Sequence, residues 1–467
     1  MIRKLSGWSK YKHYECELFE PNNVTELQNF IKNNNKGRKI IARGHGCSNG
    51  DQSVLSDGIV IDTSFLNKII NYNNQAKTIE VEAAVKLSDI LRITLKDDLF
   101  FQCIPGGLDI TVGGAVSNNV HGKDCFKNGY FNSNVSKIKI LCSSGEIVEV
   151  SNTINKEFYD NIFSSFGLLG VIISVELCLK DITSPLLEIE TTVVKNKNEM
   201  EIFFNNSNQS SDYLIAWLDC SSRKKDILRG ICKKALFVEK NQISPNQRER
   251  SINKINHSLK KRNKNTIKKF LFNIIWTLIG KLFGSKFFYF FNFVAFNLFK
   301  ILGKQKKIEL LTEFILLDEK YLPEYTTLFK SNGFLTIQPF FNNNKPFDKM
   351  EMVILLCQKF DILPVWCPIK KYKNLNKQFF DFGGDGYSIV IEFSPHEVGI
   401  DKSTKFISEL ESLIVAQKGK IYLAKDQIIS KQAFKKMYPD YKKFLSIKTK
   451  YDKRNLFISE QFIRLLT

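Results

Sequence analysis

Acidic residues are absent from one long stretch of this 467-residue chain: none occurs between Arg250 and Lys307. The stretch holds fourteen lysines and arginines, which supply most of the net charge of +20. A local positive excess of this size indicates an anionic partner, such as membrane lipid, a phosphate-bearing substrate or nucleic acid.

Long apolar runs are also missing. Residues 1–15 contain no apolar stretch of signal-peptide length, and within 265–303 two lysines leave uncharged runs of only 11 and 13 residues. A spanning helix needs about 20 apolar residues, so spanning is disfavoured. Interfacial membrane binding is favoured over a core helix pair with a basic loop, because an apolar stripe at helical spacing lies beside lysines. The stripe consists of Phe287, Phe288, Phe291, Val294, Ala295 and Leu298. We expect a cytoplasmic protein peripherally associated with the inner face of the plasma membrane.

Several common motifs are missing as well. The ten cysteines are scattered singly, without a CxxC pair or metal-ligand spacing, which favours a reducing compartment and no metal site. Neither GxxxxGK[ST] nor a GxGxxG that follows a strand and opens a helix is present, which excludes a P-loop and an ordinary Rossmann motif. No known nucleic-acid-binding motif is visible, so we expect no nucleic-acid partner.

The distribution of expected strands and helices along the chain indicates an α+β protein with more than one domain. The first 180 residues alternate short strands and helices with glycine turns, without a βαβαβ repeat. A sequence rich in Phe, Lys and Asn follows, and the last fifty residues return to a compact strand and helix texture. We predict a domain at 1–183, a second at 184–415 with a basic insertion at about 250–307, and a segment at 416–467 that returns to the first domain.

Two glycine-rich loops carry the strongest chemical signal. "ARGHGCSNGD" (42–51) follows a strand and offers backbone N–H groups without bulky side chains, as in an anion-binding nest. "GGLDITVGGAVSNNVHGK" (106–123) holds five glycines and one of only five histidines. Interior glycines each cost a helix about 1 kcal/mol relative to alanine, so an ordinary helix is not expected here. The two loops can hold the ends of one extended ligand that carries a diphosphate.

The combination of motifs resembles the flavin-dependent oxidases of the vanillyl-alcohol oxidase type, and within them the oxidases of polyprenyl-phosphate-linked sugars. The motifs occur in the same order: "GW" at 7–8, "ARGxGxSxGD", "PGxxxxTVGGAxxxxxHGK", "GLxGxI", and a late "YxAKD" followed by "MYP". The resemblance implies a PCMH-type two-part FAD-binding domain, and an α+β substrate domain with an antiparallel sheet.

The resemblance also assigns residues to roles. The FAD diphosphate is expected at Ala42, Arg43, Gly44, His45, Gly46, Cys47, Ser48, Asn49, Gly50 and Asp51. The rest of the cofactor is expected along Gly106, Thr111, Val112, Gly113, Gly114, Asn118, Asn119, Val120, His121, Val171, Ile172 and Tyr422. His121, Lys123 and Lys425 are the expected catalytic residues, and Gln338, Lys370 and Lys425 the expected substrate contacts.

Two positions depart from the family pattern. Cys47 occupies the place where many sugar oxidases attach FAD through a histidine, so we expect non-covalent FAD. Val390 occupies the place of a cysteine on a strand beside the substrate, so thiol-trapping inhibitors should not bond covalently.

These residue types suit the oxidation of a CH–OH group. Such a reaction needs a base near the hydroxyl and cations where negative charge develops on the flavin, and Lys425 can serve either need.

We expect an FAD-dependent oxidoreductase that converts a secondary hydroxyl of a polyprenyl-phosphate-linked sugar to a ketone. It would be the oxidase half of an epimerisation in cell-envelope polysaccharide synthesis, with a short-chain reductase as partner and quinone or oxygen as acceptor. An aldonolactone or alditol oxidase acting on a small soluble sugar is the alternative. A non-enzymatic basic protein that binds membranes or nucleic acid is an alternative of another class.

Overall fold

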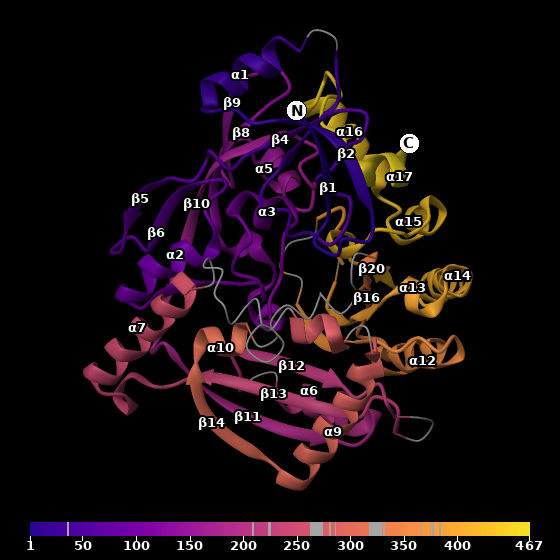
Figure 1. Ribbon diagram of the computed structural model, residues 1–467. Helices are drawn as coiled ribbons and strands as arrows, with labels where there is room; N and C mark the ends of the chain where they lie inside the picture. The colour runs from indigo at the N-terminus through magenta and orange to yellow at the C-terminus, as the bar shows by residue number, and fades with distance from the viewer. Residues whose placement is uncertain are drawn as a thin grey trace.

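The computed structural model describes most of the chain, and all structural statements below concern these residues. They are 1–34, 37–207, 210–222, 226–261, 274–279, 282–284, 286–316, 329, 332–365, 367–373, 375, 378–382 and 384–467. Helices and largely antiparallel sheets are arranged in two halves, with the N-terminal and C-terminal segments together in one half (Figure 1). The expected α+β class is confirmed.

The N-terminal half contains two sheets. A four-stranded sheet has the order β1-β2-β4-β3, in which β2 and β3 both run parallel to β4. Its elements are β1 (Ile2–Ser6), β2 (His13–Phe19), α1 (Val24–Lys32), β3 (Ile40–Arg43) and β4 (Ile59–Asp62). The second sheet, of six strands, has the order β5-β6-β10-β8-β9, with β7 also paired to β10. Its strands are β5 (Ile69–Asn73), β6 (Thr78–Glu82), β7 (Leu99–Phe101), β8 (Val135–Leu141), β9 (Ile147–Ser151) and β10 (Val171–Asp181). Its helices are α2 (Leu87–Thr94), α3 (Val112–Ser117), α4 (Cys125–Asn128) and α5 (Lys156–Ile162).

Part of the second glycine run is helical, contrary to our expectation. Helix α3 contains Gly113 and Gly114, and the Thr111 hydroxyl caps it by accepting a hydrogen bond from the backbone N–H of Gly114. A Cβ at Gly113 would lie 3.0 Å from the Cβ of Ala83. Close packing of α3 on Ala83 therefore favours glycine at this position, and the cap offsets part of its cost in helix propensity.

The second half is built on an eight-stranded antiparallel sheet with the order β14-β11-β13-β12-β17-β18-β16-β20. Its strands are β11 (Leu186–Val194), β12 (Tyr213–Leu218), β13 (Gly230–Phe237), β14 (Gln305–Leu310), β16 (Pro339–Asn342), β17 (Pro368–Tyr372), β18 (Gly386–Ile389) and β20 (Lys420–Ile421). A small separate sheet pairs β15 (Leu335–Ile337) with β19 (Ile391–Phe393). The helices of this half are α6 (Lys197–Ser207), α7 (Pro245–Lys261), α9 (Lys286–Leu302), α10 (Leu311–Ile315), α12 (Pro346–Lys359), α13 (Pro395–Val398) and α14 (Ile400–Ala416).

Helices α6 and α9 cover opposite faces of this sheet. On β13, the Cys232 side chain contacts Met200 of α6. The neighbouring Ile231 points to the other face, where its cross-strand partner Trp217 contacts Phe291 of α9 with ring centroids 6.0 Å apart.

The C-terminal segment lies against the N-terminal half (Figure 1). The backbone N–H of Ile40 on β3 donates to Leu456 O at 2.9 Å, and Ile458 N donates to Ile40 O at 3.0 Å. Helices α15 (Lys431–Met437), α16 (Tyr441–Tyr451) and α17 (Glu460–Leu466) flank this pairing. The contacts are those expected of a returning segment, while the exact domain boundaries stay a prediction.

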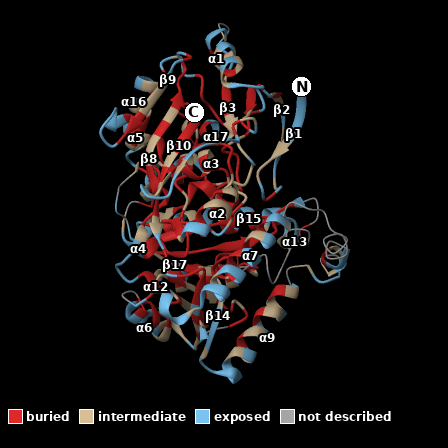
Figure 2. Ribbon diagram, turned by 90° about the vertical axis from the view of Figure 1, so that its left-hand side faces the viewer, coloured by how far each residue is buried: buried red, intermediate tan, exposed pale blue. Residues whose placement is uncertain are grey.

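Helix α9 does not present its apolar residues on one face. Phe288 is buried, but Val294 and Leu298, which the sequence pattern put in the same stripe, are 43% and 51% exposed. A second apolar surface therefore faces outward, and Figure 2 shows the mixture of buried and exposed residues along α9. Much of the predicted membrane-seeking segment, at 265–273, 280–281 and 285, lies outside the described residues. Among the helices that are described, none has both the length and the hydropathy to cross a bilayer.

Candidate flavin and substrate site

One cavity of about 630 Å³ brings most of the predicted site residues together. Both glycine loops, the turn at 165–172, the turn at 422–425 and the eight-stranded sheet contribute to its wall. The predicted residues that line it are Ala42, Gly44, His45, Gly46, Cys47, Ser48, Asn49, Gly106, Thr111, Gly113, Gly114, Asn118, Val120, His121, Lys123, Val171, Ile172, Lys370, Tyr422 and Lys425.

Six predicted residues lie behind the wall instead. Arg43 donates to Ser6 O at 2.8 Å and to the Ser53 hydroxyl at 3.1 Å, and the side-chain oxygen of Asn119 accepts from Asn132 N at 3.0 Å. These residues hold the loops in place. The six are Arg43, Gly50, Asp51, Val112, Asn119 and Gln338.

The first loop has the composition and the free donors that a diphosphate needs. The backbone N–H groups of Gly44, His45 and Gly46 have no acceptor among the described residues. Gly44 also approaches the second loop closely, because a Cβ there would lie 2.5 Å from the Thr111 hydroxyl oxygen. Burial lowers the pKa of His45, so this imidazole adds little positive charge, and the amide dipoles of the loop attract an anion.

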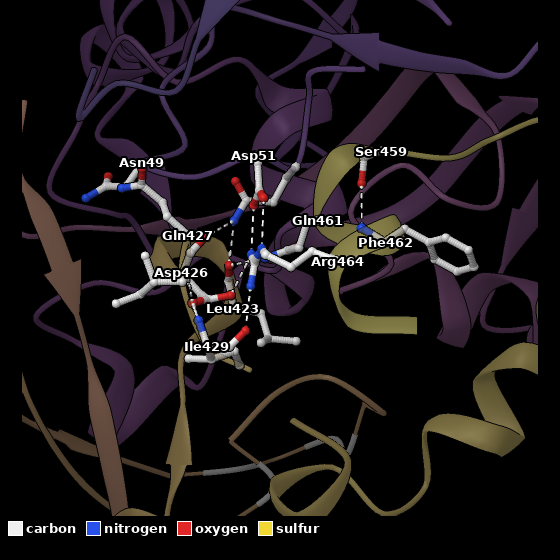
Figure 3. A network of polar contacts seen from close by, with 12 residues as sticks. Asn49, Asp51, Leu423, Asp426, Gln427, Ile429, Ser459, Gln461, Phe462 and Arg464 are labelled. Carbon is white, nitrogen blue, oxygen red and sulfur yellow. Dashed lines mark hydrogen bonds and ion pairs between the residues drawn. The ribbon is translucent and has the colours of Figure 1, made fainter. Parts of the chain in front are cut away.

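A buried ion network connects this loop to the turn that carries Lys425 (Figure 3). The Arg464 guanidinium on α17 contacts the carboxylates of Asp51 and Asp426, each at 2.9 Å. The side-chain amide of Gln461 donates to Leu423 O at 2.8 Å. A Cβ on Gly50 would overlap the carbonyl oxygen of Asp426, so only glycine allows this contact. The first glycine loop and the Lys425 turn are therefore held as one unit.

His121 is at the centre of a polar cluster between the halves. Its Nε2 atom lies 3.0 Å from the Tyr372 hydroxyl and 3.3 Å from the Gln338 amide nitrogen. That amide nitrogen also lies 2.8 Å from the Tyr372 hydroxyl and 2.9 Å from the Ser388 hydroxyl. Above the cluster, the Tyr422 ring lies 4.6 Å from the His121 ring.

The imidazole of His121 is neutral. Complete burial lowers its pKa well below the usual range, and the positive charges of Lys370 and Lys425 lower it further. The Gln338 amide nitrogen, which is a donor, and the Tyr372 hydroxyl both face Nε2 of His121, and with this orientation of the amide the ring proton is assigned to Nδ1. Nδ1 is buried and has no partner among the described residues.

The two predicted catalytic lysines have different surroundings. Lys123 is buried, and its ammonium group donates to Phe314 O at 2.6 Å and to Ile315 O at 3.1 Å. These bonds connect the second glycine loop to α10. Lys425 ends a short 3₁₀ turn, Leu423–Lys425, and lines the cavity close enough to His121 to affect its titration.

Sequence reasoning missed Tyr372 and Ser388. Tyr372 follows Lys370 by two residues on β17 and therefore shares its face, and Ser388 is the cross-strand partner of Lys370 on β18. The alternation of side chains along the strand "PIKKYK" could have indicated Tyr372 from the sequence. No feature of the sequence indicates that β18 pairs with this strand, so Ser388 could not have been found.

The residues present fit an FAD molecule. Glycines of both loops line the cavity, the first loop has backbone amide donors without an acceptor among the described residues, and His121 lines the same cavity. A group of three or more His, Cys, Asp or Glu side chains suited to a metal ion does not occur in the described part of the chain. The fold and this site define an FAD-dependent oxidoreductase.

Comparison with known proteins agrees with this class. A family model of the FAD binding domain matches residues 17–151, and a model of D-arabinono-1,4-lactone oxidase matches residues 384–465. The chain therefore contains a PCMH-type FAD-binding domain and is similar to FAD-linked oxidases in its N-terminal and C-terminal parts. The alternative of a non-enzymatic basic protein is therefore wrong.

Individual relatives cover different shares of the chain. Decaprenylphosphoryl-beta-D-ribose oxidase of Mycolicibacterium smegmatis is 23% identical over 437 residues, which are 92% of this chain and 89% of that protein. L-gulonolactone oxidase of Bos taurus is 27% identical over 180 residues, 37% of this chain and 40% of that protein. Cytokinin dehydrogenase 2 of Arabidopsis thaliana is 26% identical over 156 residues, 33% of this chain and 31% of that protein.

Proposed function

We propose that the protein oxidises a secondary hydroxyl of a sugar attached to a polyprenyl phosphate, and yields a ketone. The observation that carries the proposal is the single cavity in which the glycine wall meets His121 and Lys425. The relative named for oxidising decaprenylphosphoryl-ribose supports it, because the similarity runs over nearly the whole chain.

The residues of the cavity have different roles in the proposed reaction. Bound FAD supplies the acceptor for the hydride. His121 and Lys425, which both line the cavity, act on the substrate hydroxyl, and Lys425 takes the hydroxyl proton after it has lost its own ammonium proton to solvent, because only the neutral amine can act as a base. Tyr372 and Gln338 hold the imidazole and its tautomer. Lys370 adds positive charge on the substrate side.

Three finer features belong to the same proposal. FAD is bound without a covalent link, because Cys47 is at the expected attachment position. The ketone is passed to a short-chain reductase, which completes an epimerisation, and the electrons leave to quinone or oxygen. The outward apolar surface of α9, with Phe290, Leu298 and neighbouring lysines, supports peripheral binding to the inner face of the plasma membrane.

Oxidation of a small soluble aldonolactone is the second candidate. The match of residues 384–465 to the D-arabinono-1,4-lactone oxidase model favours it, together with similarity to L-gulonolactone oxidases. The two candidates differ in whether the substrate carries a phosphate and a lipid.

Anaerobic mixing tests the two candidates directly. The FAD-loaded protein is mixed with farnesylphosphoryl-ribose or with an aldonolactone, and loss of the visible flavin absorbance is recorded. We expect rapid bleaching with the lipid-linked sugar and slow or no bleaching with the lactone. The reverse result would replace the first candidate by the second, and no bleaching with either would reject both.

A further inference from the structure

The cavity extends beyond the site described above, into a side pocket under α9. Its floor is formed by Ile215 and Trp217 of β12 and by Ile231 and Lys233 of β13. Its roof is formed by Phe291, Ala295 and Phe299 of α9. The proposed mechanism uses none of these residues.

Regular geometry explains why these residues face one another. Ile215 pairs with Lys233 and Trp217 with Ile231 across the strands, so all four side chains leave the sheet on one face. The three roof residues are four positions apart and therefore share one side of the helix. From Phe291 to Phe299 the roof is about 12 Å long at the helical rise of 1.5 Å per residue.

Three lysine side chains, Lys233, Lys307 and Lys370, line the cavity near this apolar side pocket. Lys233 is two strands away from Lys370 in the sheet order β17-β12-β13, which corresponds to about 10 Å at the usual strand spacing. Lys307 lines the cavity from β14, the edge strand, and its ammonium group also pairs with Glu309 at 2.9 Å. A ligand that starts at Lys370 and runs under α9 thus meets a cation first and an apolar roof beyond it.

We propose that the side pocket binds the aliphatic chain of a phosphate-linked lipid, and that Lys233 binds its phosphate. The proposal rests on the proposed function, because it names where the non-reacting part of that substrate lies. A free sugar would leave this apolar surface uncovered, whereas an isoprenoid chain would bury it. Each buried methylene raises affinity about fourfold, so affinity should increase with chain length until the roof is covered.

Direct binding to the full-length FAD-loaded protein tests the proposal without turnover. Isopentenyl, geranyl and farnesyl phosphate are titrated calorimetrically below their micelle concentrations and without vesicles, with inorganic phosphate as the reference. We expect affinity to increase along the series and farnesyl phosphate to bind at least about tenfold more tightly than inorganic phosphate. Equal affinity for all four probes would overturn the proposal.

Matched variants separate the two parts of the pocket. Ala295→Trp fills the space under α9 and should weaken farnesyl phosphate about tenfold or more, while inorganic phosphate is unaffected. Ile301→Trp places the same ring on the outward side of the same helix, at a position that is 83% exposed, and should have little effect. Lys233→Gln should weaken all the phosphates, whereas Lys234→Gln should not, because Lys234 faces the other side of β13 and pairs with Glu190.

Failure of the side pocket and failure of the proposed function are distinguishable. If farnesyl phosphate binds with the expected variant pattern but no lipid-linked sugar bleaches the flavin, the pocket stands and the proposed function fails. If lipid-linked sugars bleach the flavin, but their KM changes neither with chain length nor in the Ala295→Trp variant, the proposed function stands and the pocket is refuted. Retained flavin absorbance per chain shows that each variant is folded.

Discussion

Removing Arg464 should destabilise the protein more than removing any arginine that contacts only carbonyl groups. Arg464→Met leaves the carboxylates of Asp51 and Asp426 in place, with side chains only 4% and 1% exposed. Loss of one partner from a buried ion network costs about 3–5 kcal/mol, because an uncompensated charge stays buried. With an unfolding entropy of about 1 kcal/mol/K for a chain of this size, the Tm should fall by about 3–5 °C.

The effect should depend on pH in a way that identifies its cause. Burial already raises the pKa of Asp51, and the charge of Arg464 opposes that shift. Without Arg464 the shift increases. A carboxyl whose pKa is raised by folding contributes stability that is complete below its unfolded pKa and is lost as the pH rises through its folded pKa. The penalty of Arg464→Met should therefore be small at pH 4.5 and large at pH 7.5.

Arg454 provides the matched control for this experiment. It is also in the C-terminal segment, and it donates to Ile31 O, Ser143 O and Asn34 O at 2.6–2.9 Å. Arg454→Met should cost less and show no such dependence on pH. Thermal unfolding of both variants at the two pH values measures the difference. Equal decreases in Tm for both variants at both pH values would refute the role given to the unpaired carboxylates of Asp51 and Asp426.

Four further outcomes are expected. Complete burial raises the pKa of Asp124 from 3.8 to about 6. The stability that protonated Asp124 contributes is therefore lost as the pH rises from 4 to 6, and the loss is up to about 3 kcal/mol. In Asp124→Asn, the free energy of unfolding measured with denaturant should change less over that pH range. His121→Phe should retain FAD but reduce kcat/KM about 100-fold, with His121→Gln less impaired, as stopped-flow flavin reduction would measure. Gly113→Val should lower the FAD content of the purified protein, measured by absorbance, because its side chain would collide with Ala83. Acid precipitation should leave the yellow colour in the supernatant, and a yellow pellet would contradict the interpretation of Cys47.

The two glycine loops could be predicted because local chemistry alone constrains them. A strand followed by "ARGHGCSNG" has few alternatives to a loop that exposes its amides, and the structure places most of these residues on the cavity wall. The helical turn at Val112–Ser117 was missed, because propensity counts the cost of glycine in a helix but not the tight packing of Gly113 on Ala83.

The support behind the site could not be predicted, since it depends on contacts between distant parts of the chain. Arg464 meets Asp51 across 413 residues, and Gln338 meets His121 across 217. Gln338 falls in an apolar stretch that the pattern predicts as one strand. The structure divides that stretch into β15 and β16, and this division leaves the Gln338 side chain at the polar cluster instead of in a sheet face.

Helix α9 shows why its apolar composition alone does not reveal its role. A helix that is apolar all round is normally buried or in a membrane, and periodicity cannot distinguish its faces. In the structure Phe291 and Ala295 line the cavity, whereas Phe290 and Leu298 are 65% and 51% exposed. Both faces are apolar for different reasons, since one faces the proposed lipid chain and the other the proposed membrane surface. A charged residue on either face would therefore be costly, which agrees with the absence of charge between Phe287 and Phe299.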